Sequence, residues 1–212
     1  MVKILKIDIY PSVISGTIAP PPSKSVLHRA IISACMAKGV STITNVIYSD
    51  DVTATINAFR SLGVIFTTLD EQLRIDSSSF RIGTSEIVVD CNESGSTIRF
   101  LIPLLSNVNY TVFKGKSSLI NRPMDVYYEL FTNQDLVFEK GPDYIRTKGA
   151  LRPGNYNILG DVSSHFISGL LFVLPTLDGE STIVVQGDFE SSEYVDLTVD
   201  VLKAFSIDIT RN

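Results

Sequence analysis

The sequence predicts an α/β domain in which three copies of one unit surround buried parallel helices, the third copy being incomplete. Three stretches begin with a cluster of hydroxyl residues and continue as nearly all-apolar segments of about three helical turns. A short β-branched stretch and then an amphipathic stretch follow each of them. The opening serines Ser25, Ser96 and Ser164 are 71 and 68 residues apart, and this regular spacing indicates an internal repeat.

The first element of each unit is expected to be a helix that is apolar on all sides. Its three copies are "SVLHRAIISACMAKG" (25–39), "ESGSTIRFLIPLLSN" (93–107) and "DVSSHFISGLLFVLPTLDG" (161–179). Helices without a polar face belong in the interior of a protein. We therefore expect the three helices to pack together, with their hydroxyl-rich starts at one end of the domain.

A strand, an amphipathic helix and a hairpin are expected to follow in each unit. The strands are predicted at 41–48, 109–116 and 181–188, the helices at 49–64, 122–134 and 192–207, and the hairpins at 65–76 and 136–149. The third unit offers one further strand, at 205–212, and no returning strand after it. We therefore expect the chain to be a piece of a larger protein, engineered or natural.

The start of the first helix carries charges that suit an anionic ligand. Prolines exclude helix up to Pro22, and Ser23 is expected to cap the helix that follows. Lys24 then lies in the first turn, with Arg29 further along the same side. A cation at a helix N-terminus opposes the helix dipole unless an anion binds there. On this stretch alone two interpretations stay open: an anion site, or a capped helix whose cations face water.

Composition and charge exclude several other classes of protein. The chain has 18 Lys and Arg against 23 Asp and Glu, a net charge of −5, and its lack of a basic run argues against a nucleic-acid partner. No apolar stretch reaches the ~18 residues of a membrane span, and the N-terminus lacks the apolar core of a signal peptide. Cys35 and Cys91 lie outside zinc-binding spacings, which argues against a zinc site and favours a reducing cytoplasm.

Five segments of the chain carry a family resemblance. They are "PPSKSVLHRA" (21–30), "ESGSTIRFL" (93–101), "NRPM" (121–124), "GDVSSHFISGLL" (160–171) and "SSEYVDLT" (191–198). In order and spacing they resemble the enolpyruvyl transferases, in the branch that acts on shikimate 3-phosphate. The resemblance covers the first of that family's two domains, each of which is built from three βαβαββ units.

The resemblance also implies a division of this chain. Residues 1–12 would form a strand segment that belongs to, or crosses toward, the second domain. Residues 13–212 would form the shikimate-phosphate-binding domain, with units at about 13–90, 91–150 and 151–212.

The implied reaction moves the carboxyvinyl group of phosphoenolpyruvate to the 5-hydroxyl of shikimate 3-phosphate and releases phosphate. It belongs to the shikimate pathway, which leads to chorismate and the aromatic amino acids and is the target of glyphosate. The resemblance implies a cytoplasmic monomer without metal or cofactor. Because the main acid and base groups would lie in the second domain, this chain alone would bind substrates without turnover.

The matched positions imply roles for individual residues. Lys24 would contact both substrates and polarise the reacting centre. Shikimate 3-phosphate would be held by Lys24, Ser25, Arg29, Ser163, Ser164, His165, Ser191 and Tyr194. Phosphoenolpyruvate would be held by Lys24, Gly95, Arg122 and His165.

Three positions depart from the family pattern. Pro22 replaces a glycine, Glu93 an asparagine and His165 a glutamine. A carboxylate beside two anionic substrates requires a neutralising cation near Glu93. A neutral imidazole at His165 donates one hydrogen bond and can gain charge near its ordinary pKa of about 6.5.

Several polar residues have simpler interpretations. Ser49, Asp50 and Asp51 resemble a catalytic acid pair, but they open a helix and are expected to cap it. His28 is expected on the surface or at the rim of the domain. Arg99 lies early in a buried helix and needs a partner, for which Glu93 and a substrate phosphate are both candidates.

Two rival functions are set against the resemblance. UDP-N-acetylglucosamine enolpyruvyl transferases open with Lys-Asn instead of Ser-Lys-Ser, and they lack the paired serines at 163–164. A non-catalytic repeat domain, in which the hydroxyls only cap buried helices, is the rival from another class.

Overall fold

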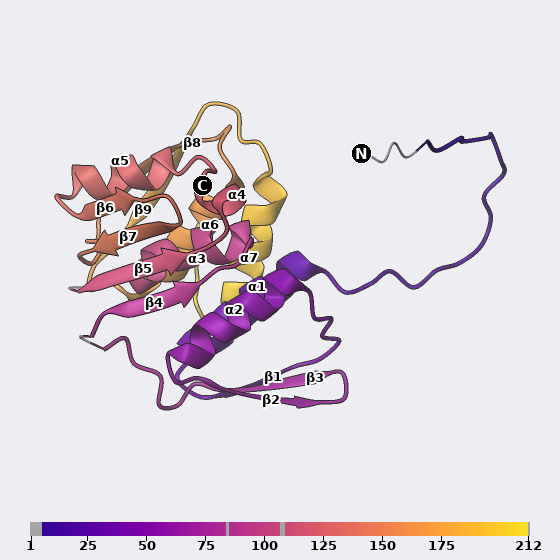
Figure 1. Ribbon diagram of the computed structural model, residues 1–212, viewed down its shortest axis with the longest axis horizontal. Helices are drawn as coiled ribbons and strands as arrows, with labels where there is room; N and C mark the ends of the chain where they lie inside the picture. The colour runs from indigo at the N-terminus through magenta and orange to yellow at the C-terminus, as the bar shows by residue number, and fades with distance from the viewer. Residues whose placement is uncertain (1–5, 84, 107–108, 212) are drawn as a thin grey trace.

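A computed structural model describes residues 6–83, 85–106 and 109–211, which fold into a mixed α/β domain with three small sheets (Figure 1). Residues 6–22 form no regular element and run away from the body of the domain. The described part of the predicted N-terminal strand, residues 6–12, therefore pairs with no other described strand. Among the described residues, no helix is both long enough and apolar enough to cross a membrane.

The first sheet lies beneath two helices. Its strands are β1 (Val40–Ile43), β2 (Ile65–Leu69) and β3 (Gln72–Asp76), in the antiparallel order β1-β3-β2. The helices α1 (Lys24–Met36) and α2 (Asp50–Ser61) run side by side above it (Figure 1). Alternation along β3 buries Leu73 and Ile75 while their neighbours stay outside, as a half-buried strand requires.

The second sheet has four strands and shows the repeat most completely. Its strands are β4 (Ile87–Asp90), β5 (Tyr110–Lys114), β6 (Val137–Lys140) and β7 (Tyr144–Lys148), in the order β4-β5-β7-β6. The helix α3 (Gly95–Leu105) joins the parallel strands β4 and β5. The helices α4 (Ser117–Ile120) and α5 (Asp125–Asn133) precede the β6–β7 hairpin.

The third sheet pairs β8 (Asn155–Leu159) with β9 (Thr182–Gln186) in parallel. Between them lie α6 (Ser164–Val173) and a 3-10 turn (Leu174–Thr176), and α7 (Ser192–Ala204) follows. The helices α1, α3 and α6 therefore begin 71 and 69 residues apart, close to the spacing of the serines.

Some elements differ from those that the sequence predicts. The strand expected at 41–48 ends at Ile43, and residues 207–211 form no strand. β4 pairs with β5, which places 87–90 in the second sheet and not in the first unit, where the predicted division puts them. β8 was not singled out by any pattern. A strand needs a partner strand, and no local pattern reports whether that partner is present.

In the core, α3 packs closely against α6. Pro103 lies inside α3 and has no N–H, so the carbonyl oxygen of Arg99 loses its helical donor. The hydroxyl of Tyr127 donates to that oxygen at 2.6 Å instead. Gly169 of α6 faces the same point: a Cβ there would lie 2.6 Å from the Arg99 oxygen and still closer to the Tyr127 hydroxyl. Only a residue without a side chain lets the two helices approach this closely.

Candidate functional site

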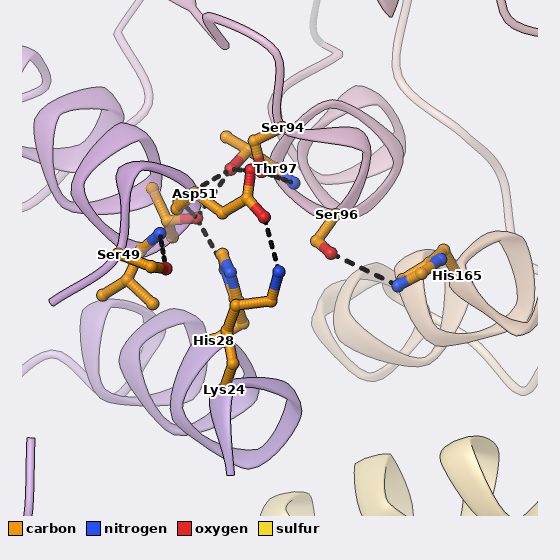
Figure 2. Close-up of polar contacts among 10 residues, drawn as sticks. Lys24, His28, Ser49, Asp51, Ser94, Ser96, Thr97 and His165 are labelled. Atoms are coloured by element: carbon orange, nitrogen blue, oxygen red, sulfur yellow. Dashed lines mark hydrogen bonds and ion pairs between the residues drawn. The ribbon is translucent and has the colours of Figure 1, made fainter. Parts of the chain in front are cut away.

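The starts of four helices meet at one place (Figure 2). The Nζ of Lys24, in the first turn of α1, donates to the Oδ2 of Asp51 on α2 at 2.6 Å. The Oγ1 of Thr97 on α3 donates to the carbonyl oxygen of Asp51 at 3.4 Å. Ser96 of α3 hydrogen-bonds His165 of α6 at 3.3 Å. The positive ends of four helix dipoles therefore gather at one site, an arrangement suited to anions.

Serines cap three of these helices. The Oγ of Ser23 accepts from the N–H of Val26 at 3.4 Å, as the sequence predicts. Ser49 and Ser94 make the equivalent bonds for α2 and α3, at 3.3 and 3.1 Å. Each cap satisfies one backbone N–H, and the other N–H groups of a first turn have no partner inside their helix.

The carboxylate of Asp51 pairs with a cation and does not cap α2. Ser49 is the cap, and the Asp51 carboxylate pairs with Lys24, whose side chain is 53% exposed while that of Asp51 is 30% exposed. Burial raises the pKa of Asp51, but hydrogen bonds from Lys24 and Ser94 and the charge of Lys24 outweigh burial and hold that pKa below its usual value. Asp51 therefore stays ionised and fixes the ammonium of Lys24 at the site.

His28 is buried, so the expectation that it lies at the surface or rim is wrong. It is 1% exposed, and its Nδ1 hydrogen-bonds the Oγ1 of Thr55 at 2.9 Å. The chain of hydroxyls continues from Thr55 to Thr97 (2.8 Å) and from Thr97 to Ser94 (2.7 Å). Burial lowers the pKa of His28 to about 4, with further lowering by the charges of Lys24 and Arg29. A neutral His28 thus links α1 to the caps of its neighbours.

His165 is also held neutral. Its Nδ1 hydrogen-bonds Ser163 at 2.9 Å, its Nε2 hydrogen-bonds Ser96, and its ring packs on Phe100 at 5.1 Å between centroids. Burial lowers the pKa of His165 to about 4, and the charge of Arg29 contributes next. His165 therefore carries no charge at neutral pH.

Stability should fall as pH is lowered from 7 to 5. Both histidines have a pKa near 4 in the folded chain and about 6.5 when unfolded, so the unfolded chain binds more protons in this range. We expect a loss of about 2 kcal/mol for each histidine, measured by urea unfolding at several pH values. His28→Asn keeps a polar partner for Thr55 without titrating, and it should remove about half of the pH dependence. An unchanged slope in this variant would contradict the assignment.

Glu93 has the neutralising partner that the sequence requires. The Nζ of Lys116 and the Oγ of Ser118 each donate to its carboxylate at 2.8 Å. The hydrogen bond from Lys116, followed by that from Ser118, lowers the pKa of Glu93. Lys116 thus supplies the cation without which a carboxylate beside two anions would be costly, and among the described residues Glu93 forms no ion pair with Arg99.

Arg122 and Arg99 meet over Gly95. A Cβ on Gly95 would lie 2.5 Å from the Nη1 of Arg122 and 3.4 Å from the Nη1 of Arg99. The absence of a side chain at Gly95 therefore leaves room for a guanidinium beside the first turn of α3. Two cations and a helix N-terminus therefore gather positive charge around Gly95.

Arg29 lies inside the domain and not on this open face. It is 1% exposed and donates to Thr198 (2.6 Å), Ser168 (3.1 Å) and the carbonyl oxygens of Ser25 (2.9 Å) and Tyr194 (3.0 Å). Burial lowers the pKa of Arg29 to about 10. Its side chain holds α1, α6 and α7 together in this structure.

The other predicted residues for shikimate 3-phosphate lie on α6, on α7 and at their starts. Ser163 bonds His165, and Ser164 is 5% exposed. Ser191 precedes α7 with a left-handed φ of 57°, and the ring of Tyr194 in the first turn is 46% exposed. α6 and α7 pack together, and Arg29 connects both to the start of α1.

Sequence reasoning missed two members of the site. Asp51 was assigned only to capping, although a second carboxylate beside a serine that already caps was a usable signal. Ser96 marked the repeat, but its bond to His165 spans 69 residues and depends on how α3 packs against α6.

Comparison with known proteins relates these features to a family. A family model described as EPSP synthase (3-phosphoshikimate 1-carboxyvinyltransferase) matches residues 10–212. The 3-phosphoshikimate 1-carboxyvinyltransferase of Clostridium botulinum (strain Eklund 17B / Type B) is 44% identical over 211 residues, which cover 96% of this chain and 49% of that protein. That of Clostridium novyi (strain NT) is 42% identical over 217 residues, which cover 97% and 50%. This chain thus spans about half the length of the curated relatives it matches.

Solved structures agree on the fold. Two structures of EPSP synthase from Acinetobacter baumannii superpose with a TM-score of 0.76. They share 24% and 25% sequence identity with this chain, and the match covers 93% of it and 45% and 46% of theirs.

Proposed function

The chain belongs to the EPSP synthase family, and on this premise we propose that it is the substrate-binding half of such an enzyme. The complete enzyme would transfer the carboxyvinyl group of phosphoenolpyruvate to the 5-hydroxyl of shikimate 3-phosphate and release phosphate. The observation that carries this proposal is the meeting of four helix N-termini beside Lys24, Arg99 and Arg122. Both substrates are multiply charged anions, which such a site binds well.

Lys24 is proposed to contact both substrates and to polarise the reacting centre. An exposed ammonium held by Asp51 at 2.6 Å can turn toward a bound anion while its partner keeps it charged. Gly95 and Arg122, with His165 nearby, are proposed to hold phosphoenolpyruvate. A neutral imidazole has one N–H, and in His165 both ring nitrogens are hydrogen-bonded to serines. To donate to a substrate oxygen, the N–H of His165 must give up its bond to a serine.

Shikimate 3-phosphate is proposed to lie along the starts of α1, α6 and α7. Ser25, Ser163, Ser164, Ser191 and Tyr194 are proposed as its polar contacts, with His165 between the two substrates. The role implied for Arg29 stays a prediction, because its donors already serve Thr198, Ser168 and two carbonyl oxygens.

Transfer needs a general base for the attacking hydroxyl and an acid for the enol methylene. Asp51 is held ionised by Lys24, which makes it a poor acid. His28 and His165 are neutral and hydrogen-bonded, and each has a pKa of about 4. They are therefore weak bases at neutral pH. We therefore propose that a second domain supplies these groups and excludes water by closing over this face.

Further features of the proposal rest on family membership. The first and third sheets are proposed as partial copies of the βαβαββ unit that surrounds the second sheet, with α1, α3 and α6 as its parallel buried helices. The division into residues 1–12 and 13–212, the cytoplasmic location and the monomeric state stay predictions.

The 212-residue chain is expected to bind shikimate 3-phosphate weakly and to release no phosphate when phosphoenolpyruvate is added. Amide chemical shifts should change at 24–29, 163–165 and 191–194 at millimolar ligand, and phosphate release would be measured in parallel with a full-length relative. Activity regained on adding the remaining half of that relative would support the proposal. Turnover by the chain alone, at a rate near that of the relative, would overturn it, and an absence of shifts would favour a non-catalytic repeat domain.

A further inference from the structure

We propose that Arg99 binds the phosphoryl group of the anion that Arg122 and Gly95 also contact, so that two guanidinium groups clamp one phosphate. This inference rests on the proposed function and adds a residue to it. Arg99 is half-buried, and among the described residues its guanidinium forms no ion pair with a carboxylate.

The donors of Arg99 are poorly satisfied. Its Nε is buried and has no hydrogen-bond partner among the described residues. Its Nη2 reaches only the carbonyl oxygen of Pro123, at 3.5 Å, and its guanidinium lies over the ring of Phe166 at 5.0 Å. An arginine presents five donors, and in half-buried Arg99 the buried Nε–H is the one that is unfavourable to leave unmet. A missing acceptor is therefore indicated.

The carboxylate nearest in sequence does not supply that acceptor. Glu93 is engaged by Lys116 and Ser118 at 2.8 Å each. Within the described part of the chain, neither Arg99 nor Arg122 forms an ion pair with a carboxylate. Of the two partners considered for Arg99 from the sequence, the ligand is the one that remains.

The second guanidinium points to the same place. The Nη1 atoms of Arg99 and Arg122 approach the same side of Gly95, where a Cβ would lie 3.4 and 2.5 Å from them. Burial lowers the pKa of Arg99, and the charge of Arg122 lowers it further. Two neighbouring cations repel each other when no anion is present. An anion bound between them attracts both, so the net electrostatic energy becomes favourable.

Charge and shape favour a phosphoryl group over a carboxylate. A phosphate ester carries nearly two negative charges at neutral pH, which matches two guanidinium groups, whereas a carboxylate carries one. Its three terminal oxygens can accept from both forks and from the free backbone N–H groups of the first turn of α3. The phosphoryl group of phosphoenolpyruvate, which leaves as inorganic phosphate, fits this description.

The test is a titration of the 212-residue chain with inorganic phosphate, and with acetate as a planar, singly charged anion. In ¹⁵N-labelled chain, the Arg99 Nε–H resonance should move along the same saturation curve as the Gly95 amide. The Arg99 Nε–H resonance is assigned by its absence from the spectrum of Arg99→Lys. Phosphate should bind at least tenfold more tightly than acetate.

Variants separate the inference from the proposed function. Arg99→Gln should weaken phosphate binding about tenfold, as should Arg122→Gln, while the exposed Arg60→Gln on α2 should change it less than twofold. Thermal unfolding shows whether Arg99→Gln folds; if it does not, the Nε–H titration of the unmodified chain decides. The clamp is overturned if phosphate shifts the Gly95 amide resonance but not the Arg99 Nε–H resonance. It is also overturned if Arg122→Gln weakens binding and Arg99→Gln does not. Either result leaves the proposed function intact. An unmodified chain that binds no phosphate overturns the clamp and the phosphoenolpyruvate contacts proposed for Gly95 and Arg122.

Discussion

Gly169→Ala is expected to destabilise the chain by about 3 kcal/mol, among the largest effects of any single methyl group in it. The new Cβ would overlap the Tyr127 hydroxyl and lie 2.6 Å from the carbonyl oxygen of Arg99 and 3.1 Å from the Cγ of Pro103. α3 and α6 would have to separate, and the carbonyl that Pro103 leaves without a helical donor would lose its hydrogen bond from Tyr127. Urea unfolding measures the change in the free energy of unfolding.

Two further variants divide this effect into its parts. Tyr127→Phe removes the hydroxyl alone and should cost about 1–3 kcal/mol, because the carbonyl oxygen of Arg99 then lacks a donor. Adding Tyr127→Phe to Gly169→Ala should cost less than the two changes separately, since the hydroxyl no longer obstructs the methyl group. Gly39→Ala is the matched control: its Cβ would meet only the Ala37 carbonyl oxygen, at 3.9 Å. Equal loss of stability in both alanine variants would contradict the close-packing explanation.

Lys24→Met should weaken the binding of shikimate 3-phosphate by about 10- to 100-fold, the effect of losing one charge-assisted hydrogen bond. The same change should leave the free energy of unfolding within about 1 kcal/mol, because Lys24 is half exposed and Asp51 remains partly accessible to water. Calorimetric titration of the folded chain measures the first effect and urea unfolding the second. In a full-length relative, the matching substitution should also reduce turnover strongly.

Controls for Lys24→Met come from two other positions. Lys203→Met removes an exposed cation from the last turn of α7 and should not change ligand affinity. Asp50→Asn removes a first-turn carboxylate that pairs with no cation among the described residues, so it should lower stability slightly and leave affinity unchanged. Ligand affinity that survives Lys24→Met would remove Lys24 from the site.

Local patterns predicted the parts of this structure that depend on local interactions. Ser23 caps α1 because its hydroxyl reaches an N–H three residues away, and such a bond can be foreseen from neighbours alone. The bond between Lys24 and Asp51 joins residues 27 apart, and it exists because α1 and α2 lie side by side. The burial of His28 has the same origin, since its partner Thr55 belongs to α2. Periodicity located the helices, but the residues that face one another across helices follow from packing, which periodicity does not report.

The pairing of Glu93 with Lys116 has a consequence for binding kinetics and entropy. The backbone N–H of Lys116 also donates to the carbonyl oxygen of Asn92 at 2.8 Å, so the turn before α3 and the turn before α4 are joined twice. One turn leads into Gly95 and the other leads through α4 into Arg122. These two links hold the backbone around Gly95 close to the backbone that leads into Arg122 before an anion arrives, which lowers the ordering cost of binding. Salt screens the exposed ion pair but not the backbone hydrogen bond, so high ionic strength should slow encounter with the anion without breaking the backbone link.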